Sequence, residues 1–153
     1  MCVLISRVVI VRAFIDCEFN GGHGELISMA IISQDGQRVF YEVVEHTQPT
    51  VPWVEENVMP ILNKPAVSMV EFKDRLKKFL EAFPNLTLIA DHMADLFYFA
   101  QKVIGAEGWM MIDYPVAMLF DPVISAKKST QKHNALEDAK ALRLSWLQTN
   151  GYI

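Results

Sequence analysis

Residues 11–19 read VRAFIDCEF, an apolar run that ends in two acids, and this stretch decides how the rest of the chain is interpreted. In a β-strand, residues two apart project to the same face, so Asp16 and Glu18 point the same way. Two carboxylates held that close repel each other unless a proton or a cation lies between them. Ligation by oxygen alone suits Mg²⁺ or Mn²⁺. The stretch therefore predicts a strand that carries half of a two-metal site.

The length and composition of the chain favour one folded domain. Its 153 residues fit a single domain spanning 1–153, and 52% apolar with 21% charged residues exclude extensive disorder. No run is long enough to cross a bilayer, so no membrane is expected as a partner. The apolar start, 1–15, carries two arginines and no small-residue cleavage site, so a first strand with a ragged leader explains it better than a signal peptide. Two cysteines build no disulfide framework, which favours a reducing, cytoplasmic setting.

The net charge of −4 argues against a protein that holds nucleic acid by general basicity. That argument weakens if the acids are metal ligands. Asp16, Glu18, Asp95 and Asp138 together carry four negative charges, which two divalent cations would balance.

The order of elements predicts an α/β fold. Apolar runs at 25–33 and 37–44, joined by an Asp-Gly turn, complete a three-strand antiparallel meander with the first strand. Ser68 and Glu71 form a capping box that opens a helix, and Pro84 ends it. Further strands are expected at 86–90 and 116–120, and further helices at 52–59, 94–104 and 135–148. The result is a mixed five-stranded sheet, a meander plus parallel strands, flanked by helices.

A second acidic segment follows the strand at 86–90, where the sites of open α/β sheets collect. Either Asp91 or Asp95 can point at the metals. The alternative for Asp91 is to cap the next helix, whereas Asp95 falls in that helix's first turn. His92 is more often a surface histidine than a ligand.

The third segment reads HNALEDA, residues 133–139, and is the most informative. If Asn134 caps the last helix, Asp138 lies in its early turns and His133 just outside it. An imidazole placed there can take a proton from water beside the metal. The basic run before it includes Lys128 and Lys132, which are either a solvated loop or neutralise phosphates.

The three segments together resemble the DEDDh 3′–5′ exonucleases of the ribonuclease H-like superfamily, most of all a short bacterial and phage exoribonuclease branch. Asp16 and Glu18 match the family's D-x-E strand. His133, Ala135 and Asp138 match its closing H-x-A-x-x-D motif. The middle aspartate matches Asp95 more loosely, so the choice between Asp95 and Asp91 stays open.

The resemblance implies a ribonuclease H-like fold and a two-metal-ion phosphodiester hydrolase that uses Mg²⁺ or Mn²⁺. By the family pattern, Asp16 bridges the two ions, Glu18 and Asp138 hold one of them, and Asp95 holds the other. His133 removes the proton of the attacking water. The substrate would be an RNA 3′ end, and the product a nucleoside 5′-monophosphate.

Other interpretations remain at this point. A DNA-directed 3′–5′ exonuclease of the same fold, a non-catalytic nucleic-acid-binding module and a phosphodiesterase for small nucleotides are alternatives, although a non-catalytic module is expected to lose its acids. Phe19 either stacks on the terminal base or packs in the core. Trp53 and Trp109 either mark the surface of a homodimer or pack under loops.

Overall fold

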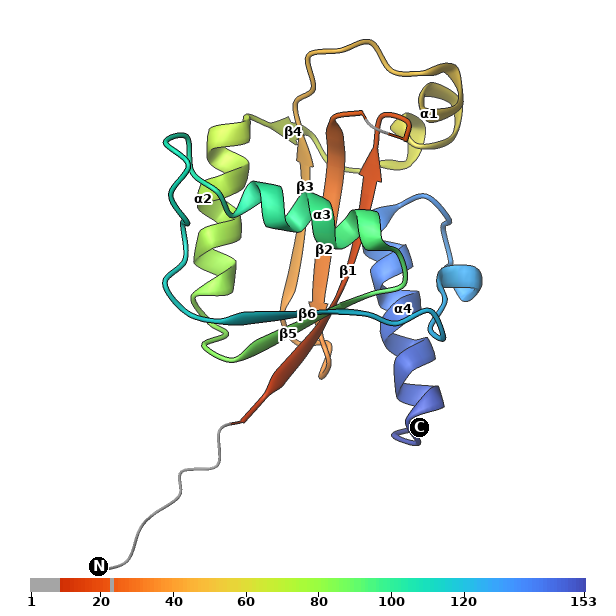
Figure 1. Ribbon diagram of the computed structural model, residues 1–153. Helices are drawn as coiled ribbons and strands as arrows, with labels where there is room; N and C mark the ends of the chain where they lie inside the picture. The colour runs from red at the N-terminus through yellow and green to blue at the C-terminus, as the bar shows by residue number, and fades with distance from the viewer. Residues whose placement is uncertain (1–8, 23) are drawn as a thin grey trace, which may run out of the picture.

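In the computed structural model, which describes residues 9–22 and 24–153, one mixed sheet separates helices on its two faces (Figure 1). The leader at 1–8 and His23 lie outside the described residues. The strands are β1 (Val11–Phe19), β2 (Leu26–Ser33), β3 (Val39–Val44), β4 (Ala66–Val67), β5 (Leu86–Ala90) and β6 (Val116–Phe120). The helices are α1 (Pro52–Asn57), α2 (Met69–Leu80), α3 (Met93–Lys102) and α4 (Ala135–Thr149), with 3₁₀ turns η1 (Met59–Ile61) and η2 (Ala126–Lys128).

The sheet has the strand order β4-β3-β2-β1-β5-β6. β1, β2 and β3 form the predicted antiparallel meander, and β5 and β6 run parallel to β1. The α/β class and the mixed sheet are therefore confirmed, but the count of five strands is wrong. A sixth strand, β4, pairs with the end of β3. Two residues are too short to show a hydrophobic period, so the sequence carried no signal for β4.

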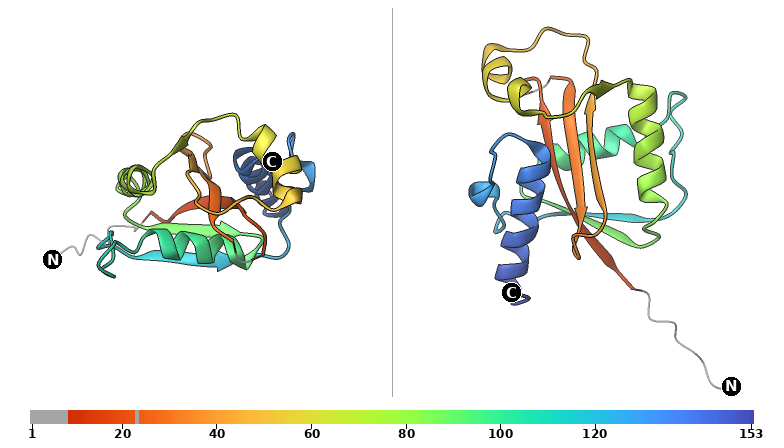
Figure 2. Two further views of the ribbon diagram at one scale, coloured as in Figure 1. Left: turned by 90° about the horizontal axis from the view of Figure 1, so that it is seen from above. Right: turned by 180° about the vertical axis from the view of Figure 1, so that it is seen from behind.

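Successive side chains along each strand point to opposite faces of the sheet, so the core is divided into two parts, one on each face. Ile15 and Leu88 pack with α2 and α3, whereas Phe14 and Ile89 pack with α4. α3 lies in front of the strands in Figure 1 and behind them in the reverse view of Figure 2, where α4 lies in front. Asp16 and Glu18 have the parity of Phe14, so both belong to the α4 face.

The capping signals of two helices are confirmed. The Ser68 hydroxyl accepts the backbone N–H of Glu71 at 3.2 Å, and the Asn134 side chain accepts that of Glu137 at 3.1 Å. The cap of α3 differs from the Asp91 alternative, because the imidazole of His92 accepts the N–H of Ala94 at 3.1 Å. Asp91 is therefore not used as a helix cap.

The helix predicted at 52–59 is interrupted. α1 ends at Asn57, and Pro60 lies within the 3₁₀ turn η1 that follows. None of the helices in the described part of the chain has the length and apolar character needed to span a bilayer.

The parallel arrangement brings three chain segments to one end of the sheet. β1 and β5 finish at the same edge, and α3 begins three residues after β5 ends. The ladder between β1 and β5 covers only Val11–Phe14 on β1. The last five residues of β1 therefore lie beyond this ladder, and the acids are among them.

Candidate metal centre

Strand β1 supplies the first two carboxylates. Asp16 lies opposite Ala30 of β2, and Glu18 lies opposite Ser28. Both acids are half-buried, because β2 covers one side of them and the start of α4 covers the face. The register of β1 shifts between Glu18 and Phe19, which is typical of strands that end at a functional site.

The segment between β5 and α3 supplies two more. Asp91 is the first residue after β5, and Asp95 lies in the first turn of α3. Asp95 is buried, and one of its oxygens accepts the backbone N–H of Cys17 at 3.1 Å. This bond occupies a β1 N–H that lies beyond the β1–β5 ladder, and it ties the start of α3 to the first two acids.

The start of α4 supplies the fifth carboxylate and a histidine. One oxygen of Asp138 accepts the backbone N–H of His133 at 3.0 Å. Asn134 caps α4 and also donates to the carbonyl of Ile61 at 2.8 Å, so the segment is held from two directions. His133 adopts a positive φ of 67°, which turns the chain sharply just before the helix.

The ligand atoms of these residues form two groups of three. Asp16, Asp91 and Asp95 offer one set of atoms that lie within 4.8 Å of one another, and Glu18, His133 and Asp138 offer a second set with the same spread. Every acid predicted from the sequence is therefore brought to one region. The sequence left Asp91 and Asp95 as alternatives, whereas the structure brings both together with Asp16.

Burial and mutual repulsion make these carboxyl groups hard to ionise. Burial raises the pKa of Glu18 to about 8, and the charges of Asp138 and Asp95 add to the effect. Burial and the charge of Asp91 raise the pKa of Asp95 to about 8. Burial, followed by the charge of Asp95, raises the pKa of Asp16 well above its usual range. The site strongly favours bound protons or bound cations over bare negative charge.

Two unsatisfied oxygens support cations as the fitting occupants. Oδ2 of Asp16 and Oδ1 of Asp138 are buried and have no hydrogen-bond partner. Among residues 9–22 and 24–153, no lysine or arginine forms an ion pair with any of the five carboxylates. A buried polar atom without a partner is costly, and hard oxygen donors suit Mg²⁺ or Mn²⁺. The donor set therefore fits divalent cations.

A basic rim adjoins the second group. A hollow of about 280 Å³ is lined by Asp91, His133 and Asp138 together with Lys127 and Lys132. Lys128, which the sequence suggested, instead lines another hollow beside the last helix. Lys127 lines both hollows, and no signal in the sequence distinguishes it from its neighbour Lys128.

Trp53 is an aromatic neighbour of the site that the sequence did not assign to it. Its ring lies edge-on against the imidazole of His133, with 4.8 Å between the ring centroids and 84° between the planes. Its side chain is 52% exposed. No sequence signal relates positions 53 and 133, because only the folding of α1 onto the α4 side brings them together.

Phe19 is placed in a stack with Tyr98 of α3, with 4.8 Å between centroids and 24° between planes. The hydroxyl of Tyr98 donates to the carbonyl of Gly24 at 2.6 Å, which fixes the pair beside the turn after β1. This arrangement corresponds to the packing alternative for Phe19. Its contact with a nucleotide base stays a prediction.

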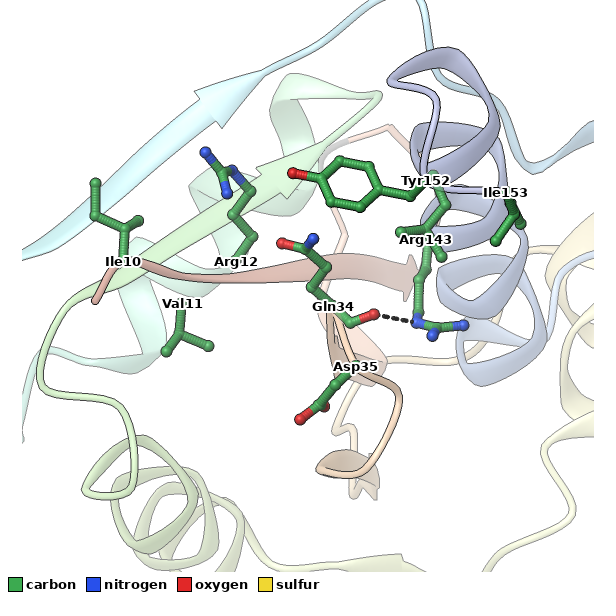
Figure 3. A pocket seen from close by; sticks show the side chains of 9 residues that line it. Ile10, Val11, Arg12, Gln34, Asp35, Arg143, Tyr152 and Ile153 are labelled. Atoms are coloured by element: carbon green, nitrogen blue, oxygen red, sulfur yellow. Dashed lines mark hydrogen bonds between the residues drawn. The ribbon is translucent and has the colours of Figure 1, made fainter.

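A larger hollow, of about 450 Å³, lies at the other end of β1 (Figure 3). Arg12, Asp35 and Tyr152 line it, and Arg143 donates from Nε to the carbonyl of Gln34 at 2.7 Å. None of the five clustered acids reaches it. The larger hollow is therefore not the one that holds the clustered acids.

The chain matches no protein-family model, and a search of curated proteins gives no match. An assignment of function therefore depends on the residues and their geometry.

Proposed function

We propose that this protein is a metal-dependent 3′–5′ exonuclease that hydrolyses RNA 3′ ends to nucleoside 5′-monophosphates, on a ribonuclease H-like fold. One observation carries the proposal. Five carboxylates and one histidine, from three distant chain segments, converge in two adjacent groups of ligand atoms. Two groups of this kind suit a pair of divalent cations, and a pair of cations is an arrangement that nucleases and phosphatases use.

The proposed fold is supported by the topology. β1, β2 and β3 form an antiparallel meander, and β5 and β6 extend it as parallel strands, as the resemblance to the exonuclease family implies. The acids follow the same order as the family motifs, from β1 through the start of α3 to the start of α4.

The protein side chains have separate roles in the proposed reaction. Asp16, Asp91 and Asp95 would hold one Mg²⁺ or Mn²⁺, and Glu18 and Asp138 would hold a second. Two such cations stabilise the charge that develops on the attacking and leaving oxygens.

His133 is the proposed general base. A free ring nitrogen of His133 accepts the proton of the attacking water. The bond from its backbone N–H to Asp138 holds the imidazole beside the second group, and Trp53 limits its movement on one side.

The rim of the site supplies contacts for a nucleic-acid end. Lys127 and Lys132 line the hollow next to His133 and would neutralise substrate phosphates. Trp53 offers a half-exposed ring at the same place, and stacking on an aromatic side chain holds a terminal base without regard to sequence. We expect Trp53→Ala to raise the KM for a short RNA about 10-fold or more, since one stacked base contributes about 1–3 kcal/mol.

Cleavage of end-labelled oligonucleotides tests the proposal. RNA and DNA of the same sequence, each with a labelled 5′ end, are incubated with Mg²⁺, Mn²⁺ or EDTA. We expect a ladder of products that shorten by one nucleotide, on RNA and with metal only. A ladder on DNA alone would identify the DNA-directed alternative. Binding of both polymers without cleavage under any metal would reject the enzyme and favour the non-catalytic module.

A further inference from the structure

α3 and β6 share one outer side of the molecule, and that side is unusually apolar. Figure 2, in the view from above, places α3 and β6 next to each other along this side. We call it the α3–β6 face. Seven large apolar side chains, each between 39% and 76% exposed, form it: Met93, Phe97, Ile104, Trp109, Met110, Met118 and Phe120.

The α3 part of this face is a regular stripe. Met93, Phe97, Ala100 and Ile104 recur at helical spacing, whereas Leu96, Phe99 and Val103 turn toward the sheet and are buried. The helix is therefore apolar on two sides. One side covers the sheet, and the other has no covering element in the described part of the chain.

The helix and the strand are joined by a groove. Ala100 and Ile104 on the α3 side, Met118 on β6 and Met110 of the loop between them line a hollow of about 450 Å³. Its walls are mostly apolar, and Asp113 is the one charged residue among those that line it. The face is thus continuous from the helix to the strand, and its exposed side chains are not isolated from one another.

Strand β6 also has unpaired backbone groups, because it is the edge strand of the sheet. The N–H of Asp121 donates to the carbonyl of Ala90 on β5 at 2.8 Å. Backbone groups alternate in direction along a strand, so those of Met118 and Phe120 point away from β5. An apolar edge strand with free N–H and C=O groups readily adds another strand.

The area of the face is that of a stable protein interface. At about 150–250 Å² for a large side chain, seven that are about half exposed leave on the order of 700 Å² of apolar surface. The largest patch on a typical monomer is about 300–600 Å². A partner in a standard interface contributes about 800 Å².

We propose that a second copy of this chain covers the α3–β6 face, with the two β6 strands paired antiparallel across a two-fold axis. With Met118 opposite its own counterpart, Val116 lies opposite Phe120, and each strand supplies the outward backbone groups that the other needs. The same symmetry packs each α3 stripe against the partner, so the face is self-complementary and the dimer is closed.

A second copy fits better than an unrelated partner because the face offers shape and backbone groups but little charge. Asp113 is the one charged residue among those that line its groove, which include no lysine or arginine. An acidic or phosphorylated partner would therefore meet a carboxylate and no basic residue among those that line the groove. This proposal does not depend on the proposed nuclease activity.

Light scattering after gel filtration tests the dimer, on the full chain at about 50 µM, well above a micromolar Kd. We expect twice the chain mass for the unaltered protein. Phe97→Glu places a charge on the face and is expected to give a monomer. Val70→Glu is the matched control, because Val70 is an exposed apolar residue of α2 outside the face.

A second variant tests the strand pairing itself. Met118→Pro removes an N–H that points away from β5, so it should abolish the dimer while the sheet within each chain persists. Circular dichroism and a cooperative thermal transition would show that each variant is folded. The proposal is overturned if the unaltered protein is a monomer at this concentration, forms open aggregates, or stays a dimer in both face variants. Loss of the dimer in Val70→Glu to the same degree as in Phe97→Glu also overturns it.

Discussion

Asp16 is the residue on which the other acids act. It belongs to the first group of ligand atoms and shares a strand face with Glu18 of the second. Burial raises its pKa most, and the charges of Asp95, Glu18, Asp138 and Asp91 raise it further. Its Oδ2 has no hydrogen-bond partner. The side chain is therefore poorly stabilised in the absence of a cation, and its position is better explained by binding than by stability.

We expect Asp16→Asn to abolish hydrolysis and Mn²⁺ uptake while raising the melting temperature of the metal-free protein. The amide has nearly the same shape but carries no charge, so it removes repulsion and one ligand together. Titration calorimetry with Mn²⁺ and thermal melts in EDTA measure the two effects. Glu56→Gln, at an exposed position of α1, is the control for loss of one charge. Unchanged Mn²⁺ uptake by Asp16→Asn would contradict the proposed metal centre.

We expect His133→Ala to lower turnover by about 10²-fold or more, as loss of a general base does. His46→Ala is the matched control, because His46 is only half-buried and its ring bonds the loop carbonyl of Gln48. Normal turnover of His133→Ala at neutral pH would remove this residue from its role.

At the scale of single elements, the start of α4 does more than begin a helix. Asn134 caps it through Glu137 and bonds the carbonyl of Ile61, which is the last residue of η1. His133 precedes the cap by one residue and Asp138 follows it by four. Asn134 therefore positions both the proposed general base and a metal ligand. Its loss should lower activity in addition to stability, whereas the loss of an ordinary helix cap should lower stability alone.

We expect Asn134→Ala to destabilise the fold by about 1–3 kcal/mol, since it removes a cap and leaves the partly buried carbonyl of Ile61 without its donor. Turnover should fall as well, because His133 and Asp138 lose their fixed positions. Ser68→Ala removes a comparable cap, on α2, and should cost about 1 kcal/mol with turnover unchanged. Urea denaturation and the cleavage assay measure the two effects. Equal losses of turnover in both variants would show that Asn134 acts only through stability.

At the scale of the whole molecule, the acids lie where α3 and α4 begin and the parallel strands end, between the two halves of the core. Tertiary packing holds them together against their repulsion. The global stability of the metal-free protein must therefore depend on the charge of this centre.

We expect the metal-free protein to lose stability as pH rises from about 5 to about 8.5. Free carboxyl groups titrate near about 4 in an unfolded chain, whereas the folded pKa of Glu18 and that of Asp95 are raised to about 8. Between these values the folded state binds more protons than the unfolded state, so unfolding becomes easier as pH increases.

Thermal melts in EDTA across this pH range measure the effect. Added Mn²⁺ should restore more stability at pH 8.5 than at pH 5.5, because protons compete with the metal at the lower pH. The Asp16→Asn variant is the control, since removal of one acid should flatten the profile. A metal-free protein that is most stable at the alkaline end would contradict the raised pKa values.

The sequence by itself determined the local features of this protein. The apolar run before Asp16, the Asp-Gly turn, and the caps at Ser68 and Asn134 each depend on residues close in the chain, and the structure has all of them. The same local spacing identified the acids on β1 and α4 that later meet. These signals could be read because backbone geometry within a strand or a helix repeats with a known period.

Only the tertiary structure decided which distant groups meet. It brought Asp91 together with Asp95, placed Trp53 against His133, and put Lys127 at the edge of the hollow that holds Asp138. It also added β4 and left the α3–β6 face uncovered. None of these follows from a period along the chain. Each depends on how separate elements pack, and that packing is set by the burial of the whole core.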